Sequence, residues 1–255
     1  MLRLQPRAAV GVDWECPPDM DALLARMLKL RGIGSAEEAA AFLNPDEGQL
    51  ADPLSMFGMA DAARAVRGAI EGKRAVCVYG DYDADGVCAT AILTLFLRSR
   101  GVDARAYIPS RHDEGYGLNA AAVEAIAGEG AQLLVTVDLG VGAADEVALA
   151  RRLGMDVVVT DHHRPGGQLP DCAMAHPALG DYPTPHLCGA GVAFKLVEAV
   201  AGRAAALPYV DLAAIATVAD VVPLIGENRA IVALGLAAIN AAPRAGVAAL
   251  MRAAG

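Results

Sequence analysis

The sequence has 255 residues, of which 55% are hydrophobic, and its formal net charge at pH 7 is -9. This length and apolar content suffice for one α/β domain with a smaller addition, and they exclude an intrinsically disordered chain. The negative charge argues against a general polyanion-binding surface. It still allows a metal-dependent nuclease, because cations would neutralise the acidic ligands. No apolar stretch approaches the roughly 20 residues of a membrane-spanning helix, and the N-terminus lacks the apolar segment of a secretory signal.

The cysteines are five in number and scattered, without a Cys-x-x-Cys pair. Cys77 and Cys88 lie in apolar runs, and we expect both to be small core residues rather than metal ligands. An odd set of unpaired cysteines is typical of a reducing compartment, which predicts a cytoplasmic protein.

Residues 1–72 are predicted to form a helical N-terminal region packed on the main domain. Ser35 and Glu38 have the spacing of a capping box for a short helix that ends near Asn44. A second periodic segment, Met59–Glu71, ends at Gly72.

From residue 73 to about residue 240, apolar runs typical of strands alternate with helical segments. The predicted strands are 75–79, 104–108, 133–137 and 156–160. The predicted helices are 87–100, 119–128 and 144–153, with further helices beginning near Gly191, Tyr209 and Glu227. This alternation indicates an α/β fold with a Rossmann-like, mostly parallel sheet and helices on both faces. Residues 241–255 are predicted to begin a helical connector.

Asp81, Asp83 and Asp85 directly follow the first predicted strand, in the motif Asp-Tyr-Asp-Ala-Asp-Gly. In open α/β sheets, ligands bind at the carboxyl ends of the strands. If the extended path continues beyond Gly80, residues of one parity point to one side and the three carboxylates converge. Carboxylates this close repel one another unless cations neutralise them. The motif therefore favours a metal site over a solvated acidic loop.

The surrounding sequence excludes two other interpretations of this motif. An EF-hand loop would need a bidentate Glu where Ile92 stands, and no strand would precede it. The nucleophile motif of haloacid-dehalogenase-type phosphatases would need a later lysine and a second acidic pair at a strand end. Lys195 is the only lysine after Lys73, and the later strand is followed by Asp-His-His instead.

Three further positions carry candidate ligands. Asp138 follows the strand 133–137 and could be either a ligand or the N-cap of the next helix. Asp161-His162-His163 follows the strand 156–160 and adds imidazole nitrogen, which together with carboxylates suits manganese or another borderline ion. Asp220 lies among apolar residues, where an unpaired charge is costly without a partner or a metal.

The four motifs together resemble the DHH phosphoesterase superfamily. They are Asp-Tyr-Asp-Ala-Asp-Gly, Thr-Val-Asp-x-Gly, Val-Thr-Asp-His-His and Ala-Asp-x-Val-Pro-Leu, in this order. Segments 114–118, 188–195 and 223–229 are similar to its branch of RecJ-like exonucleases, and the resemblance runs from about residue 52 to residue 235. Leu139 departs from the pattern, which more often has a small or polar residue there. We expect local repacking at Leu139 rather than loss of metal.

This resemblance implies a two-metal enzyme that degrades single-stranded DNA in the 5′→3′ direction during repair and recombination, using Mn²⁺ or Mg²⁺. The implied metal ligands are Asp83, Asp85, Asp138, His162 and Asp220, with Asp85 and Asp138 as bridging candidates. Asp81 and Asp161 would orient ligands and water. His163 would face the scissile phosphate, and no covalent nucleophile is needed.

Basic residues that could contact the nucleic-acid backbone are few. The candidates are Arg111, His112, Arg164 and Arg229, each of which could equally be a solvated surface charge. The aromatic content of 4% is too low for an extended stacking platform. The resemblance implies single-stranded DNA as the partner, a single-strand-binding protein and a RecQ-type helicase as further partners, and no membrane.

RecJ-like proteins continue into a second domain that closes over the metal site and into an oligonucleotide-binding fold, and we find neither in this sequence. Without that cover we expect cation binding but slow cleavage, because positioning supplies a large part of such catalysis. Two alternatives stay open. One is a phosphodiesterase acting on short oligoribonucleotides or cyclic dinucleotides. The other is a non-catalytic replication scaffold, although a scaffold has no need for mutually repelling carboxylates.

Overall fold

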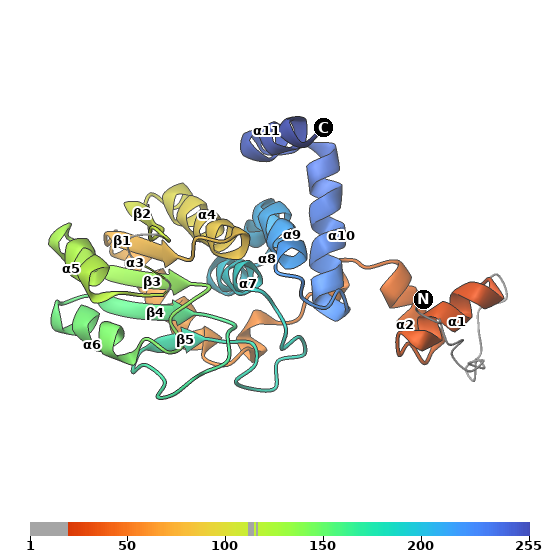
Figure 1. Cartoon of the computed structure of the whole chain (residues 1–255), viewed down its shortest axis with the longest axis horizontal. Coiled ribbons are helices and arrows are strands. Elements are labelled where there is room, and N and C mark those ends of the chain that lie inside the picture. The colour runs from red at the N-terminus through yellow and green to blue at the C-terminus, as the bar shows by residue number, and fades with distance from the viewer. Residues whose placement is uncertain (1–19, 112–114, 116) are drawn as a thin grey trace, which may run out of the picture.

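The structure, a computed structural model, describes residues 20–111, 115 and 117–255. Its centre is a five-stranded sheet in the order β2-β1-β3-β4-β5, in which all neighbouring strands are parallel (Figure 1). The strands are β1 (Val76–Gly80), β2 (Ala104–Tyr107), β3 (Leu133–Val137), β4 (Asp156–Thr160) and β5 (Ala173–Ala175). Because the strands are parallel, all their carboxyl ends lie at one edge of the sheet.

Helices cover both faces of this sheet (Figure 1). One face carries α3 (Met59–Glu71), α4 (Ala84–Ser99) and α7 (Gly189–Ala201), and the other carries α5 (Ala120–Gly128) and α6 (Ala144–Arg152). The side chains of β1 alternate between the two apolar cores. Val76 and Val78 belong to the first, Cys77 and Tyr79 to the second. The predicted Rossmann-like fold class is confirmed.

The element boundaries follow the predictions closely, with two differences. Residues 173–175 form a short fifth strand that the Pro/Gly-rich stretch around it concealed. Helix α4 begins at Ala84, three residues earlier than predicted, because the carboxylate of Asp83 caps it by accepting hydrogen bonds from Asp85 N and Gly86 N, both 2.9 Å. The extended path therefore ends at Asp83, and the argument from strand parity does not apply to Asp85.

The N-terminal helices α1 (Ala22–Leu30) and α2 (Ala36–Leu43) lie apart from the sheet (Figure 1). Ser35 Oγ accepts a hydrogen bond from Glu38 N (3.1 Å), as predicted. The reciprocal bond to Glu38 Oε2 comes from Gly34 N (2.7 Å) instead of Ser35 N. Two short 3-10 helices, η1 (Glu47–Gln49) and η2 (Pro53–Ser55), lead to α3, which packs on the sheet. The last helix of the predicted N-terminal region, α3, thus contributes to one of the two apolar cores of the sheet.

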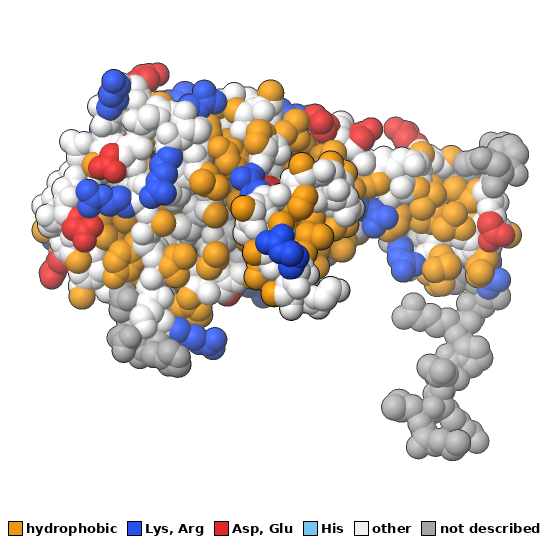
Figure 2. All heavy atoms as spheres, turned by 90° about the horizontal axis from the view of Figure 1, so that it is seen from above, with side chains coloured by type: hydrophobic (Ala, Val, Ile, Leu, Met, Phe, Trp, Pro, Cys, Tyr) orange, Lys and Arg blue, Asp and Glu red, His pale blue; other side chains and the backbone are white. Residues whose placement is uncertain are grey.

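The chain ends in a helical segment. Its elements are α8 (Arg203–Ala206), η3 (Leu207–Tyr209), α9 (Val210–Ala219), α10 (Gly226–Ala241) and α11 (Ala245–Ala254). Apolar side chains are exposed over α11 and over α1 (Figure 2). No single helix of the described residues meets the length and apolarity needed to cross a membrane. Taken together, α10 and α11 meet those criteria as a pair bent by 86°.

A buried ionic network ties Ala51, between η1 and η2, to α7 and α10. Lys195 is fully buried, with Nζ 2.6 Å from Glu198 Oε2 and 2.9 Å from Glu227 Oε1. Glu227 also accepts hydrogen bonds from Tyr182 Oη (2.6 Å) and from Ala51 N (3.1 Å). Removing the lysine alone would leave the buried Glu227 without a cation, whereas Glu198 would keep its ion pair with Arg203 Nε (2.8 Å).

Lys195→Met is therefore expected to destabilise the fold by about 3–5 kcal/mol, the usual cost of breaking a buried ion pair by removing one partner. Urea unfolding in the presence of a chelator would measure it, with the exposed Lys73→Met as the matched control. Equal unfolding free energies for the two variants would contradict a stabilising role for this network.

Candidate metal centre

The register of the parallel strands brings three aspartates to one line. Gly80 of β1 pairs with Val137 of β3, which pairs with Thr160 of β4. The next residues along these three strands are Asp81, Asp138 and Asp161. All three side chains are buried, with at most 3% exposure. The sheet therefore places three carboxylates side by side at its carboxyl edge.

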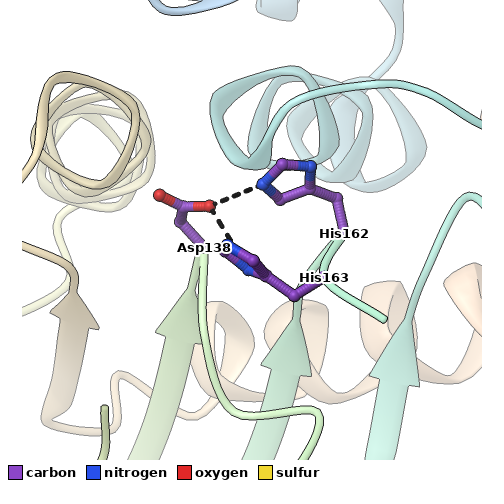
Figure 3. Close-up of side chains that lie close together, drawn as sticks. All are labelled: Asp138, His162 and His163. Atoms are coloured by element: carbon purple, nitrogen blue, oxygen red, sulfur yellow. Dashed lines mark ion pairs between the residues drawn. The ribbon is translucent and has the colours of Figure 1, made fainter. Parts of the chain in front are cut away.

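His162 lies at the centre of a wider cluster. Its Nε2 is 3.0 Å from Asp138 Oδ1, 3.7 Å from Asp85 Oδ2 and 3.9 Å from Asp220 Oδ2. Figure 3 shows both histidines, which follow β4, pointing toward Asp138 at the end of β3. One imidazole thus faces carboxylates contributed by a strand end and two helices.

Three overlapping groups of side chains each present ligand atoms within 4.8 Å of one another. The groups are Asp138, His162 and His163; Asp85, His162 and Asp220; and Asp81, Asp83 and Asp138. Asp138 and His162 each belong to two groups. The described residues therefore bring together every acid and histidine that the motifs predicted as ligands, on a scale that could hold more than one cation.

Asp138 is the most constrained of these ligands. It has a left-handed backbone (φ 63°), and its Oδ1 is buried without a hydrogen-bond partner among the described residues, although His162 Nε2 is near. Burial raises the pKa of this carboxyl to about 7, against the opposing effect of His162. The N-cap alternative is excluded, because α6 has Ala143 at its N-cap. A cation would supply the partner that Oδ1 lacks, so these residues fit a metal.

Asp85 is held from a separate helix. Its Oδ2 accepts a hydrogen bond from Gly189 N (2.6 Å) and its Oδ1 from Ala190 N (2.7 Å), both at the N-terminus of α7. The two N–H groups belong to the segment 188–195. This segment resembles RecJ-like exonucleases in sequence, but the resemblance assigned it no part in the metal site. Backbone donors have no side-chain signature, so sequence reasoning missed them.

Asp161 orients the two histidines. Its Oδ1 accepts from His162 N (2.7 Å), from His163 N (3.0 Å) and lies 2.8 Å from His163 Nδ1, while its Oδ2 accepts from Val141 N (2.8 Å). Burial alone would raise the pKa of Asp161, but these hydrogen bonds together lower it. The hydrogen bond that His163 Nδ1 donates to the Asp161 carboxylate raises the pKa of His163 to about 9.

A third histidine, His176, supports the same segment and was missed in the sequence. It is fully buried at the end of β5, and its Nδ1 accepts from Ala178 N (3.1 Å). Its Nε2 therefore carries the proton and donates to the carbonyl oxygen of His163 (2.8 Å). Only the position of β5, which the sequence did not reveal, could have identified it.

The remaining acids have less constrained surroundings. Asp81 Oδ1 accepts from Tyr82 N (2.7 Å), and burial raises the pKa of the Asp81 carboxyl. Asp83 is exposed and caps α4. Asp220 is the C-cap of α9, followed by Val221 in a left-handed conformation (φ 57°), and burial raises the pKa of Asp220 as well.

The candidate DNA-contacting residues are placed differently from one another. The Arg111 guanidinium lies 5.3 Å from the centre of the Tyr82 ring, beside the first motif. Arg164 lines an open pocket together with His163 and Asp161. Arg229 on α10 instead contacts Phe42, with its guanidinium 3.8 Å from the ring centre. His112 lies outside the described residues.

Leu139, which departs from the resemblance, is buried in the apolar cluster beneath α5 and α6. Its carbonyl oxygen accepts a hydrogen bond from Thr136 Oγ1 (2.9 Å). Its side chain thus belongs to the core and is not among the grouped ligands.

The chain is similar to known proteins in sequence and in fold. A family model described as "DHH family, N-terminal domain" matches residues 75–219. The chain is 43% identical to the single-stranded-DNA-specific exonuclease RecJ of Bacillus subtilis (strain 168), covering 91% of this chain and 30% of that protein. It is similar to a structure of exonuclease RecJ bound to manganese (TM-score 0.74, 40% identity, 80% of this chain, 53% of that one). It is also similar to RecJ in complex with Mn²⁺ from Thermus thermophilus (TM-score 0.80, 34% identity, 95% and 37%).

The coverage is unequal in the two directions. The chain spans 30% of the relative from Bacillus subtilis and 45% of the corresponding proteins from Dickeya dadantii and Escherichia coli. It therefore matches less than half the length of these relatives.

Replacing Asp161 by asparagine should lower the pKa of His163 from about 9 toward its ordinary value of 6.5, because the carboxylate that raises it is lost. An NMR titration of the imidazole Cε1–H signals in the metal-free protein would measure the change. Asp171→Asn, at an almost fully exposed carboxylate, is the control. A His163 that still titrates near pH 9 in Asp161→Asn would contradict this account of the pair.

Proposed function

The chain belongs to the DHH family, as its four motifs predicted, and we propose that it is the metal-binding part of a 5′→3′ exonuclease acting on single-stranded DNA. Relatives from several bacteria carry the name single-stranded-DNA-specific exonuclease, at 37–43% identity. Because the chain spans less than half of these proteins, their activity is a proposal for it and not a finding.

One observation carries the proposal: a buried Asp138 oxygen without a hydrogen-bond partner faces an imidazole that two further carboxylates also approach. His162 Nε2 lies 3.0 Å from that oxygen but does not make the well-directed hydrogen bond that buried polar atoms usually have. Burying several carboxylates together is costly unless positive charge neutralises them. The ligand atoms that a cation site needs therefore already lie close together in this structure.

The chemistry of the ligands suits two divalent cations, Mn²⁺ or Mg²⁺. Carboxylate oxygen binds either ion, and imidazole nitrogen favours manganese. Solved relatives are described as complexes with manganese and with Mg²⁺. The ligands we propose are Asp83, Asp85, Asp138, His162 and Asp220, with Asp85 and Asp138 bridging. When bound, a pair of such ions activates water and stabilises the leaving oxygen of a phosphodiester.

The other residues of the site have supporting roles in this proposal. Asp161 holds the ring of His163 through Nδ1, and the raised pKa keeps that imidazole protonated at neutral pH. His163 would then present a cation to the scissile phosphate. Asp81 would orient ligands and water. Arg111 and Arg164 would contact the DNA backbone, one beside the first motif and the other beside the Asp-His-His segment.

The cellular setting follows from the same proposal. A single-strand exonuclease acts in DNA repair and recombination in the cytoplasm. A single-strand-binding protein and a RecQ-type helicase are proposed partners, because one protects and the other generates the substrate.

With Mn²⁺ and 5′-labelled single-stranded DNA, the chain is expected to release mononucleotides, and Asp138→Asn to lower the rate by more than about 100-fold, because it removes a ligand charge. Product length on a denaturing gel measures both. Asp171→Asn, which also removes one acidic charge but lies outside the grouped ligands, should leave the rate unchanged.

The outcomes separate the alternatives. Cleavage restricted to di- and trinucleotides would indicate a short-oligonucleotide phosphodiesterase. Mn²⁺ binding without any hydrolysis would favour the scaffold, provided that joining the C-terminal part of a longer relative after Gly255 does not restore activity. Absence of Mn²⁺ binding would reject every enzymatic alternative.

The apparent affinity for Mn²⁺ should rise by at least about tenfold between pH 6 and pH 8. Asp138 has a pKa of about 7 and must be ionised to bind, and His162, whose burial is outweighed by the neighbouring carboxylates that raise its pKa, must be neutral. Protons compete with the cation below these pKa values and no longer do so above them. Calorimetry in two buffers of different ionisation enthalpy would detect the protons that Asp138 and His162 release on binding at pH 6. An affinity that stays constant over this range would show that Asp138 is not a ligand.

A further inference from the structure

We infer that Gly189 is a positioning residue of the metal centre, and that the N-terminus of α7 fixes how the Asp85 and Asp138 carboxylates face each other. This inference rests on the proposed metal-dependent function. It assigns a role to a residue that binds neither metal nor substrate.

The first step concerns Asp85. This residue lies in the first turn of α4 and is 1% exposed, yet both its carboxylate oxygens are bonded to a different helix. The first N–H groups of a helix have no partner within it and carry partial positive charge. Gly189 and Ala190 thus hold the Asp85 carboxylate in one orientation. Each oxygen keeps a second lone pair for a cation.

The second step concerns Asp138. A Cβ atom built on Gly189 would lie 2.5 Å from Asp138 Cβ, 2.5 Å from Oδ1 and 2.6 Å from Cγ. Asp138 cannot easily move away, because it is 1% exposed and its left-handed backbone already restricts it. Gly189 has no positive φ, so what the site needs is the missing side chain rather than backbone freedom. A single residue thereby contacts one carboxylate through its N–H and the other through its Cα.

Gly191, in the same turn of α7, provides the contrast. A Cβ atom there would come 3.1 Å from Leu187 Cδ2, the flexible end of an apolar side chain, and its three nearest atoms all belong to Leu187 and Cys188. Gly191→Ala is therefore a matched control for the effect of adding a methyl group to this helix.

The main test measures Mn²⁺ binding by calorimetry on the metal-stripped chain, Gly189→Ala and Gly191→Ala. We expect Gly189→Ala to bind about ten- to a hundredfold more weakly, the usual loss when a group that orients ligands is changed. Gly191→Ala should bind as the unaltered chain does. The urea midpoints of the two variants in chelator measure any loss of folding stability separately from the loss of affinity. Wild-type affinity in Gly189→Ala would overturn the inference.

A second measurement needs neither metal nor the Gly189 variant. In the metal-free chain, hydrogen exchange of the Gly189 and Ala190 amides should become at least about tenfold faster in Asp85→Ala, because the carboxylate that accepts from them is removed. The Val192 amide, bonded to Cys188 O within the helix, is the internal control. Asp171→Ala, at an exposed carboxylate outside the grouped ligands, is the control for loss of an acidic charge and should leave these amides unchanged.

Unchanged exchange of Gly189 and Ala190 in Asp85→Ala would overturn the inference. If the unaltered chain binds no Mn²⁺, the proposed function fails, and the exchange rates alone still decide whether α7 holds Asp85.

Discussion

Buried carboxylates crowd around one imidazole at the edge of this sheet, and their mutual repulsion has to be offset by whatever surrounds them. Backbone N–H groups offset part of this repulsion. The N-terminus of α7 donates to Asp85, the start of α4 donates to Asp83, and the residues after β4 donate to Asp161. Asp138 Oδ1 receives no backbone N–H among the described residues and faces the imidazole of His162, 3.0 Å away. Asp83, Asp85 and Asp161 are therefore held by backbone hydrogen bonds, whereas Asp138 keeps an oxygen that a cation could bind.

Much of this arrangement follows from the sequence because it is local. Apolar runs bounded by acids define β1, β3 and β4, and parallel pairing then aligns the residues that follow them. The composition of the motifs, together with their order along the chain, was enough to identify the family. The same local reasoning located the capped start of α2 at Ser35.

What the sequence could not reveal depends on contacts between distant segments or on atoms that carry no side-chain identity. The hydrogen bonds from Gly189 and Ala190 to Asp85 join residues about a hundred positions apart through backbone groups. His176 supports His163 only because a three-residue strand brings it there, and such a strand is too short to show a pattern. Arg229 lies near a recognised motif, but its guanidinium packs on the ring of Phe42. The motif gives no indication of this contact.

The pairing of Gly80 with Val137 and Thr160 also has a bearing on how such a protein can change in evolution. Inserting or deleting a residue within β1, β3 or β4 would shift one aspartate out of line and turn its side chain to the opposite face. The turns at the amino ends of these strands, at 72–75, 129–132 and 153–155, carry no such constraint. Length variation among family members should therefore collect at the amino edge of the sheet, while the distance from each strand to its acid stays fixed.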